Sequence, residues 1–129
     1  MTTASHPFDR LQQTVKQLRG PDGCPWDRKQ TVHSLVKYLR EEFAEIITAI
    51  DTDDANNLCE ELGDFLYLIL MIAEISSEQD YFTISDVIGS IDRKLIRRHP
   101  HVFETHSQID EAELRKQWER IKKSEKTGE

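Results

Sequence analysis

Apolar residues recur along this chain at the spacing of an α-helix. The pattern is clearest over residues 32–50 and in the segment that follows, where the apolar positions are Leu35, Leu39, Phe43, Ile46 and Ile50, then Leu58, Leu62, Phe65, Ile69 and Ile72. Intervals of three and four residues place each set on one face of a helix. No alternating pattern typical of a β-strand competes. The sequence therefore predicts an all-α fold, a bundle of about five helices.

Capping and breaking residues define the expected helix boundaries. Five helices are expected, at residues 8–19, at residues 32–50, from Asp53 or Asp54 as N-cap, from Ile84 to just before Pro100, and at residues 111–123. The segment 20–23 is a strong breaker. Residues 24–27 are interpreted as a loop, and residues 124–129 as a polar, disordered tail.

The chain length indicates a single domain over residues 1–129 with a small core. Only 37% of the residues are hydrophobic, so we expect a homodimer or homotetramer to complete the bundle. Four apolar positions favour such an interface because they extend or lie partly outside the main apolar stripes: Ile47, Leu66, Leu70 and Ala73.

The formal net charge of −7 disfavours binding to nucleic acid or to an anionic membrane. The N-terminal residues do not resemble a signal peptide, and the apolar stretch 65–73 is too short to cross a bilayer. Cys24 and Cys59 form neither a CxxC motif nor a disulfide framework. These features favour a cytoplasmic protein.

Two pairs of acidic residues interrupt the apolar stripes of neighbouring helices. Each pair has i, i+3 spacing, which places its members on one helix face: Glu42 with Glu45, and Glu61 with Asp64. Carboxylates that point toward a helix seam are costly unless a cation pairs them. Solvated charges on amphipathic helices are the alternative interpretation. Two pairs in two stripes favour a metal site of four carboxylates.

An all-oxygen ligand set selects a hard cation, Mg²⁺ first and Mn²⁺ as a substitute. Helical di-iron sites typically use Glu-x-x-His, but here Glu45 and Asp64 stand where the histidines would be. Zinc is disfavoured because nitrogen and sulfur ligands are lacking.

Basic and aromatic residues supply candidate substrate contacts. Lys94 and Arg98 share a helix face by i, i+4 spacing and fit either a phosphate clamp or complementation of the helix dipole. Trp118 and Lys122 repeat this spacing, with a core anchor as the alternative for Trp118. Trp26 offers a flat surface that suits base stacking and core filling equally.

Three blocks in this order resemble a MazG nucleotide pyrophosphohydrolase domain. They are Gly23-Cys24-Pro25-Trp26-Asp27 with Gln30-Thr31, the acidic pairs Glu41-Glu42-x-x-Glu45 and Glu61-x-x-Asp64, and the segment from Lys94 to Phe103. The resemblance extends over about residues 11–122. It implies an all-α NTP pyrophosphatase fold that cuts NTPs or dNTPs to a monophosphate and pyrophosphate.

The resemblance also implies roles for individual residues. Glu42, Glu45, Glu61 and Asp64 become Mg²⁺ ligands, and Lys94 and Arg98 lie near the phosphates. Trp118 and Lys122 match a Trp-x-x-x-Lys associated with activity. Glu41 is expected either to support the metal ligands from outside the ligand set or to act as general base, and Trp26 and Arg97 are expected as substrate contacts.

Two features depart from the family pattern. Better-known members carry two such domains, and Leu68 stands where similar sequences often have glutamine, which leaves the preferred nucleoside open. Three alternatives to NTP hydrolysis remain. They are a related pyrophosphohydrolase acting on another nucleotide such as phosphoribosyl-ATP, a helical carboxylate protein with a redox metal, and a non-enzymatic helical interaction module.

Overall fold

The computed structural model describes residues 6–128, and every regular element in this range is helical. The all-α prediction is therefore confirmed. The chain divides into two compact units, Met1–Ile84 and Ser85–Glu129. Among the described residues, no helix is both long and apolar enough to cross a membrane.

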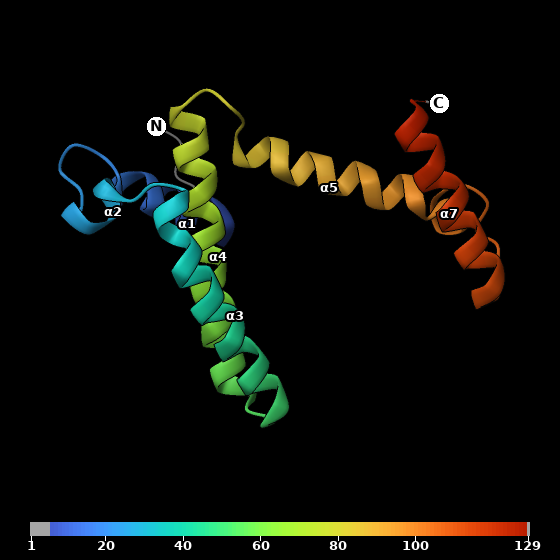
Figure 1. The fold of residues 1–129 in the computed structure, drawn as a ribbon, viewed down its shortest axis with the longest axis horizontal. Coiled ribbons are helices and arrows are strands. Elements are labelled where there is room, and N and C mark those ends of the chain that lie inside the picture. The colour runs from blue at the N-terminus through green and yellow to red at the C-terminus, as the bar shows by residue number, and fades with distance from the viewer. Residues whose placement is uncertain (1–5, 129) are drawn as a thin grey trace. The chain divides into compact units, whose positions relative to one another are not determined.

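The first unit is built around a helical hairpin. Helix α3 (Val36–Asp51) and helix α4 (Ala55–Glu78) lie side by side, joined by a short turn (Figure 1). Asp54 caps α4 as predicted, because its side chain accepts a hydrogen bond from the backbone N–H of Asn57 at 3.1 Å. The remaining elements are α1 (Pro7–Leu18), α2 (Pro25–Lys29) and the 3₁₀ helix η1 (His33–Leu35).

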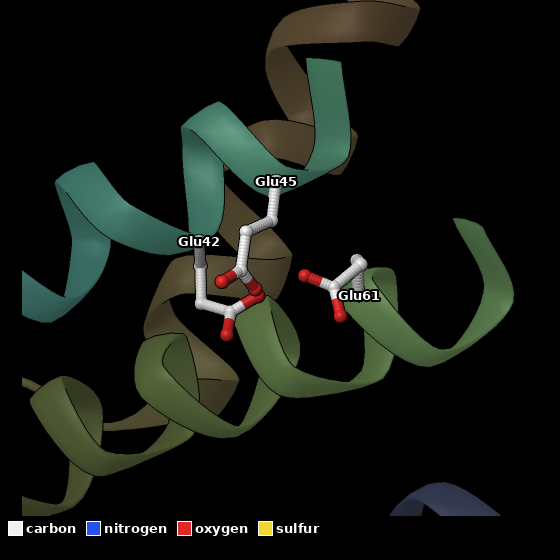
Figure 2. Close-up of side chains that lie close together, drawn as sticks. All are labelled: Glu42, Glu45 and Glu61. Carbon is white, nitrogen blue, oxygen red and sulfur yellow. The ribbon is translucent and has the colours of Figure 1, made fainter. Parts of the chain in front are cut away.

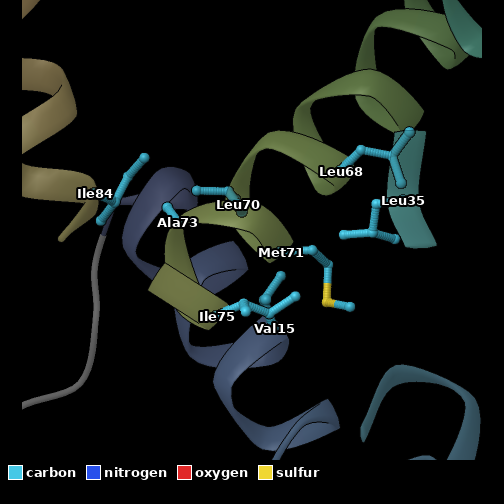
Figure 3. Packing of buried hydrophobic residues seen from close by; sticks show 8 residues of the cluster. All are labelled: Val15, Leu35, Leu68, Leu70, Met71, Ala73, Ile75 and Ile84. Atoms are coloured by element: carbon cyan, nitrogen blue, oxygen red, sulfur yellow. The ribbon is translucent and has the colours of Figure 1, made fainter. Parts of the chain in front are cut away.

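The core of this unit forms where α1 and η1 pack on the C-terminal half of α4 (Figure 3). Val15, Leu35 and Met71 are its largest fully buried side chains. The cluster is completed by Leu68, Leu70, Ala73, Ile75 and Ile84. This packing fixes the rotation of α4, and thereby the direction in which its acidic residues point.

Several sequence predictions for this unit were wrong in detail. The predicted loop at residues 24–27 lies largely in α2, because Pro25 suits the first helical position. Helix α3 begins at Val36 rather than near Val32, after the 3₁₀ turn. Leu70 and Ala73 were expected at an oligomer interface, but they are buried against the chain's own core.

The second unit contains α5 (Ile84–Arg98), α6 (Pro100–Phe103) and α7 (Glu111–Thr127), of which Ile84 itself belongs to the first unit. Helix α5 ends before Pro100 as predicted. Asp110 caps α7 by accepting from the N–H of Glu113 at 2.9 Å. Helix α7 continues through Thr127, so the expected polar tail is helical over residues 124–127; residue 129 lies outside the described residues.

Candidate metal and nucleotide site

Three glutamates converge between α3 and α4. One carboxylate oxygen from each of Glu42, Glu45 and Glu61 lies within 4.8 Å of the others. Figure 2 shows the two α3 side chains and the α4 side chain pointing toward one another. Helical spacing explains this locally, since residues three apart on α3 are neighbours on one face. Glu61 meets them from the partner helix of the hairpin.

These carboxylates are crowded and partly buried. One oxygen each of Glu42 and Glu61 is buried without a hydrogen-bond partner. The pKa of Glu61 is raised to about 8, first by its hydrogen bond with Glu45, then by burial and by the negative charge of Glu42. Burial, followed by the charges of Glu45 and Asp64, raises the pKa of Glu42. The cluster therefore resists ionisation until a cation compensates its charge.

Asp64 lies at the edge of this arrangement. Its carboxylate is close enough to Glu42 to raise the pKa of that group. It is exposed, however, and does not belong to the set of three that converge within 4.8 Å. The structure thus brings together three of the four predicted ligands and places the fourth beside them.

The donor set fits a hard divalent cation. Each of the three converging groups offers carboxylate oxygen, and two buried oxygens lack partners. Mg²⁺ prefers oxygen ligands and is often held by one or two carboxylates together with substrate phosphates.

A pocket of about 300 Å³ adjoins the carboxylates. Its acidic side consists of Glu41, Glu42 and Asp64. The remaining lining residues are Trp26, Tyr38, Tyr67 and Leu68. The Trp26 and Tyr38 rings meet edge to face with centroids 5.3 Å apart. One pocket therefore combines carboxylates with aromatic surface, as a metal-bound nucleotide requires.

Of the residues that line this pocket, Trp26 and Glu41 were predicted from the sequence as site residues, whereas Tyr38 and Tyr67 were not. Trp26 is half-buried and packs against the core cluster, which agrees with its anticipated core-filling role; base stacking by Trp26 stays a prediction. Tyr38 is three residues after Leu35 and four before Glu42. This helical spacing could have placed it on the same face as Glu42. Tyr67 stands one turn beyond Asp64 without any local signature.

Sequence and structure comparisons identify the family. The model of the MazG nucleotide pyrophosphohydrolase domain matches residues 30–103, more than half of the chain. This chain belongs to the MazG nucleotide pyrophosphohydrolase family. The match includes all four predicted metal ligands and crosses the boundary between the two compact units.

Two sequence relatives and one solved structure are similar to this chain over most of its length. It is 47% identical over 126 residues to the nucleoside triphosphate pyrophosphohydrolase/pyrophosphatase MazG of Thermotoga maritima, covering 98% of this chain and 48% of that protein. It is 48% identical to the uncharacterized protein YabN of Bacillus subtilis, covering 94% of this chain and 25% of YabN. The crystal structure of a mazG-related protein from Thermotoga maritima matches with TM-score 0.76 and 30% identity, covering 89% and 98% of the two chains.

The chain thus spans between a quarter and about half of the length of these two curated relatives. The solved mazG-related protein, by contrast, is covered almost completely.

The other predicted site residues of this MazG chain lie in the second unit. Arg98 donates to Glu125 from Nη2 at 2.8 Å, and Arg97 donates to the same carboxylate from Nε at 2.5 Å. Lys94 is exposed on the same helix. The positive charges of Arg98, the predicted phosphate contact, and of Arg97, the predicted substrate contact, are therefore neutralised in part by one acidic residue.

Trp118 is half-buried, its ring meets that of His99 at 6.0 Å between centroids, and its indole Nε1 is buried without an acceptor. Lys122 lies 3.7 Å from the carboxylate of Glu119. All of these contacts lie within the second unit. The roles of Trp118 in substrate binding and of Lys122 in catalysis stay predictions.

Proposed function

We propose that this chain hydrolyses nucleoside triphosphates, NTPs or dNTPs, to a nucleoside monophosphate and pyrophosphate with the help of Mg²⁺. One observation carries the proposal. Three carboxylates with two partnerless buried oxygens adjoin a pocket with an aromatic wall. A metal-bound triphosphate satisfies both halves of this arrangement, because its phosphates share the cation while its base occupies the apolar surface.

The names of relatives support the same activity. Proteins from Thermotoga maritima and Escherichia coli that are 47% and 40% identical to this chain are called nucleoside triphosphate pyrophosphohydrolases. Since this chain spans only about half of each of them, we carry their activity over as a proposal. We place the enzyme in the cytoplasm, in accord with the two free cysteines.

The four acidic residues Glu42, Glu45, Glu61 and Asp64 would hold the cation, with Mn²⁺ as a substitute for Mg²⁺. The bound metal would supply positive charge for the phosphates and lower the pKa of a water molecule. Glu41 lines the same pocket outside the converging set, which suits a group that orients the attacking water or accepts its proton. Trp26 would stack on the base.

The basic residues of the second unit are proposed as phosphate contacts from the family resemblance. Lys94, Arg97, Arg98 and Lys122 would bind phosphate oxygens and stabilise the charge that develops on the leaving pyrophosphate. Trp118 would contact the substrate with its partnerless indole N–H. No covalent intermediate is required.

We further propose that the active unit is a homodimer or homotetramer. Apolar side chains at helical spacing are exposed on α3, among them Phe43, Ile47 and Ile50, and on α4, among them Leu62, Leu66 and Ile69. Phe43 is 58% exposed and Ile50 54%. Burial of apolar surface stabilises an interface by about 25 cal/mol per Å². A second copy of the chain would therefore cover these side chains favourably.

The decisive experiment is incubation of the purified protein with each of the common NTPs and dNTPs and Mg²⁺, with products separated by chromatography. We expect a monophosphate and pyrophosphate in equal amounts. Release of diphosphate and orthophosphate would refute the proposed reaction. Turnover of phosphoribosyl-ATP alone would move the substrate to the related class, and absence of metal-dependent turnover would favour an interaction module.

A further inference from the structure

Asp27 is a buried carboxylate that takes no direct part in the pocket lining. Its side chain is 5% exposed, and its Oδ1 accepts a hydrogen bond from the Tyr67 hydroxyl. A buried carboxylate is costly unless donors satisfy it. The bond joins α2 to α4 across 40 positions of sequence, so it is a tertiary contact rather than a local cap.

Two aromatic residues next to this hydrogen bond line the pocket. Tyr67 lines the pocket itself, and Trp26, the neighbour of Asp27 in α2, lines it as well. Because the Tyr67 hydroxyl is directed to Asp27, the wall offers ring surface rather than a free hydroxyl. Such a surface suits stacking, which tolerates any base.

The position of α2 is held by further hydrogen bonds from its surroundings. Arg19 donates from Nη1 to the backbone carbonyl oxygens of Asp27 at 2.6 Å and of Gln30 at 3.2 Å. The same guanidinium is fixed by Glu78 through bonds of 2.8 and 2.7 Å. Gln30 Nε2 donates to the carbonyl oxygen of Trp26 at 2.9 Å. The five-residue helix is therefore anchored at its backbone, and Asp27 anchors it through a side chain to the pocket wall.

We propose that Asp27 is a positioning residue that, through the hydrogen bond from Tyr67, holds Trp26 and Tyr67 as the two stacking walls for the nucleobase. The inference rests on the proposed function, since it assigns the aromatic side of the same pocket to the base. It assigns neither residue a contact with the metal or the phosphates.

The kinetic test compares Tyr67→Phe, Asp27→Ala and Asp27→Asn with the unchanged protein. Loss of one positioning hydrogen bond in Tyr67→Phe or Asp27→Ala raises KM about tenfold and leaves kcat within about twofold. The rise is similar for ATP, GTP, CTP and UTP, and inhibition by inorganic tripolyphosphate, which has no base, is unchanged. Asp27→Asn retains an acceptor for the Tyr67 hydroxyl, so its KM should stay near that of the unchanged protein.

Tyr81→Phe is the matched control, because it removes a hydroxyl from a tyrosine that is 73% exposed in the same unit. An unchanged KM in Tyr67→Phe would overturn the proposal. So would a loss restricted to one base, or an equal loss of tripolyphosphate inhibition.

A second measurement needs no turnover. The chain has two tryptophans, so in a Trp118→Phe background the fluorescence reports Trp26 alone. Adding Tyr67→Phe should increase quenching of Trp26 by acrylamide at a temperature where every variant is folded, and Asp27→Asn should not. If the protein hydrolyses no nucleotide, the proposed function fails while this measurement still decides the positioning role. Equal quenching in all variants would refute that role.

Discussion

Arg98 and Glu125 form a salt bridge in which Nη2 and Oε1 are 2.8 Å apart. The carboxylate of Glu125 also binds Arg97, and the two arginines lower its pKa to about 2. One acidic side chain of α7 thus occupies both α5 arginines assigned to the phosphates in the proposed function. A triphosphate that binds Arg98 must compete with this carboxylate.

We expect Glu125→Gln to lower KM for nucleoside triphosphates by about two- to fivefold. The neutral glutamine competes with phosphate for the two arginines more weakly than the glutamate does. The melting temperature should fall slightly as the ion pair is lost. Steady-state kinetics at fixed Mg²⁺ would check this. Glu111→Gln, in the first turn of the same helix, is the charge-matched control. A raised KM would indicate that Glu125 orients the arginines instead.

Replacing Glu61 by alanine should abolish metal-dependent turnover while the fold is retained. The change removes one oxygen ligand, together with a buried carboxyl group whose ionisation the neighbouring carboxylates oppose. Activity assays combined with circular dichroism test both halves of this expectation. Glu60→Ala provides the control, because Glu60 is exposed, adjacent in α4 and outside the converging set. Full turnover by the purified Glu61→Ala protein would remove Glu61 from the site.

The stability of the metal-free protein should depend on pH through Glu61. Folding raises the pKa of this group from 4.5 to about 8, so the folded state binds the proton more tightly than the unfolded state. The resulting stabilisation is complete below the unfolded pKa and is lost as pH rises through about 8. In EDTA, the melting temperature should therefore fall between about pH 5 and about pH 8, the interval between the unfolded and the folded pKa.

Glu61→Gln cannot titrate at this position and should flatten that profile. Addition of Mg²⁺ to the unchanged protein should raise the melting temperature most at the alkaline end. An identical slope in the variant would contradict the assignment of the pH dependence to Glu61.

A charge placed on the exposed apolar face should reduce self-association. Ile50→Glu and Leu62→Glu each put a carboxylate among the exposed side chains of α3 and α4. Light scattering at micromolar concentration should show a smaller species than for the unchanged protein. Thr48→Glu adds the same charge at an exposed polar position of α3. A fully active monomer of the unchanged protein would refute the oligomer proposal.

The sequence predicted those features that depend on local periodicity. Residues three apart on one helix must be neighbours, so the Glu42–Glu45 pair could be anticipated, and the short turn to α4 brought Glu61 to it. The apolar stripe of α4 was less predictable, since helical spacing does not say which face α1 will cover. Ile69 is 37% exposed, whereas Leu70 is buried.

Long-range polar contacts could not be predicted at all. The hydrogen bond between Tyr67 and Asp27 depends on how α2 packs against α4, and no local sequence pattern at either residue predicts it. Glu125 was assigned to a polar tail from the polar character of residues 124–129, and its arginine partners lie 27 and 28 positions away in the sequence. Both contacts arise from tertiary packing, which periodicity does not encode.

The guanidinium of Arg19 has a consequence for the dynamics of the first unit. It holds the backbone of α2 and the side chain of Glu78 at the same time, so α2 cannot detach without disturbing the contact between α1 and α4. Opening of the aromatic wall and undocking of α1 should then be one cooperative event. Backbone amides of these two segments would exchange with solvent deuterium together, with the same opening free energy.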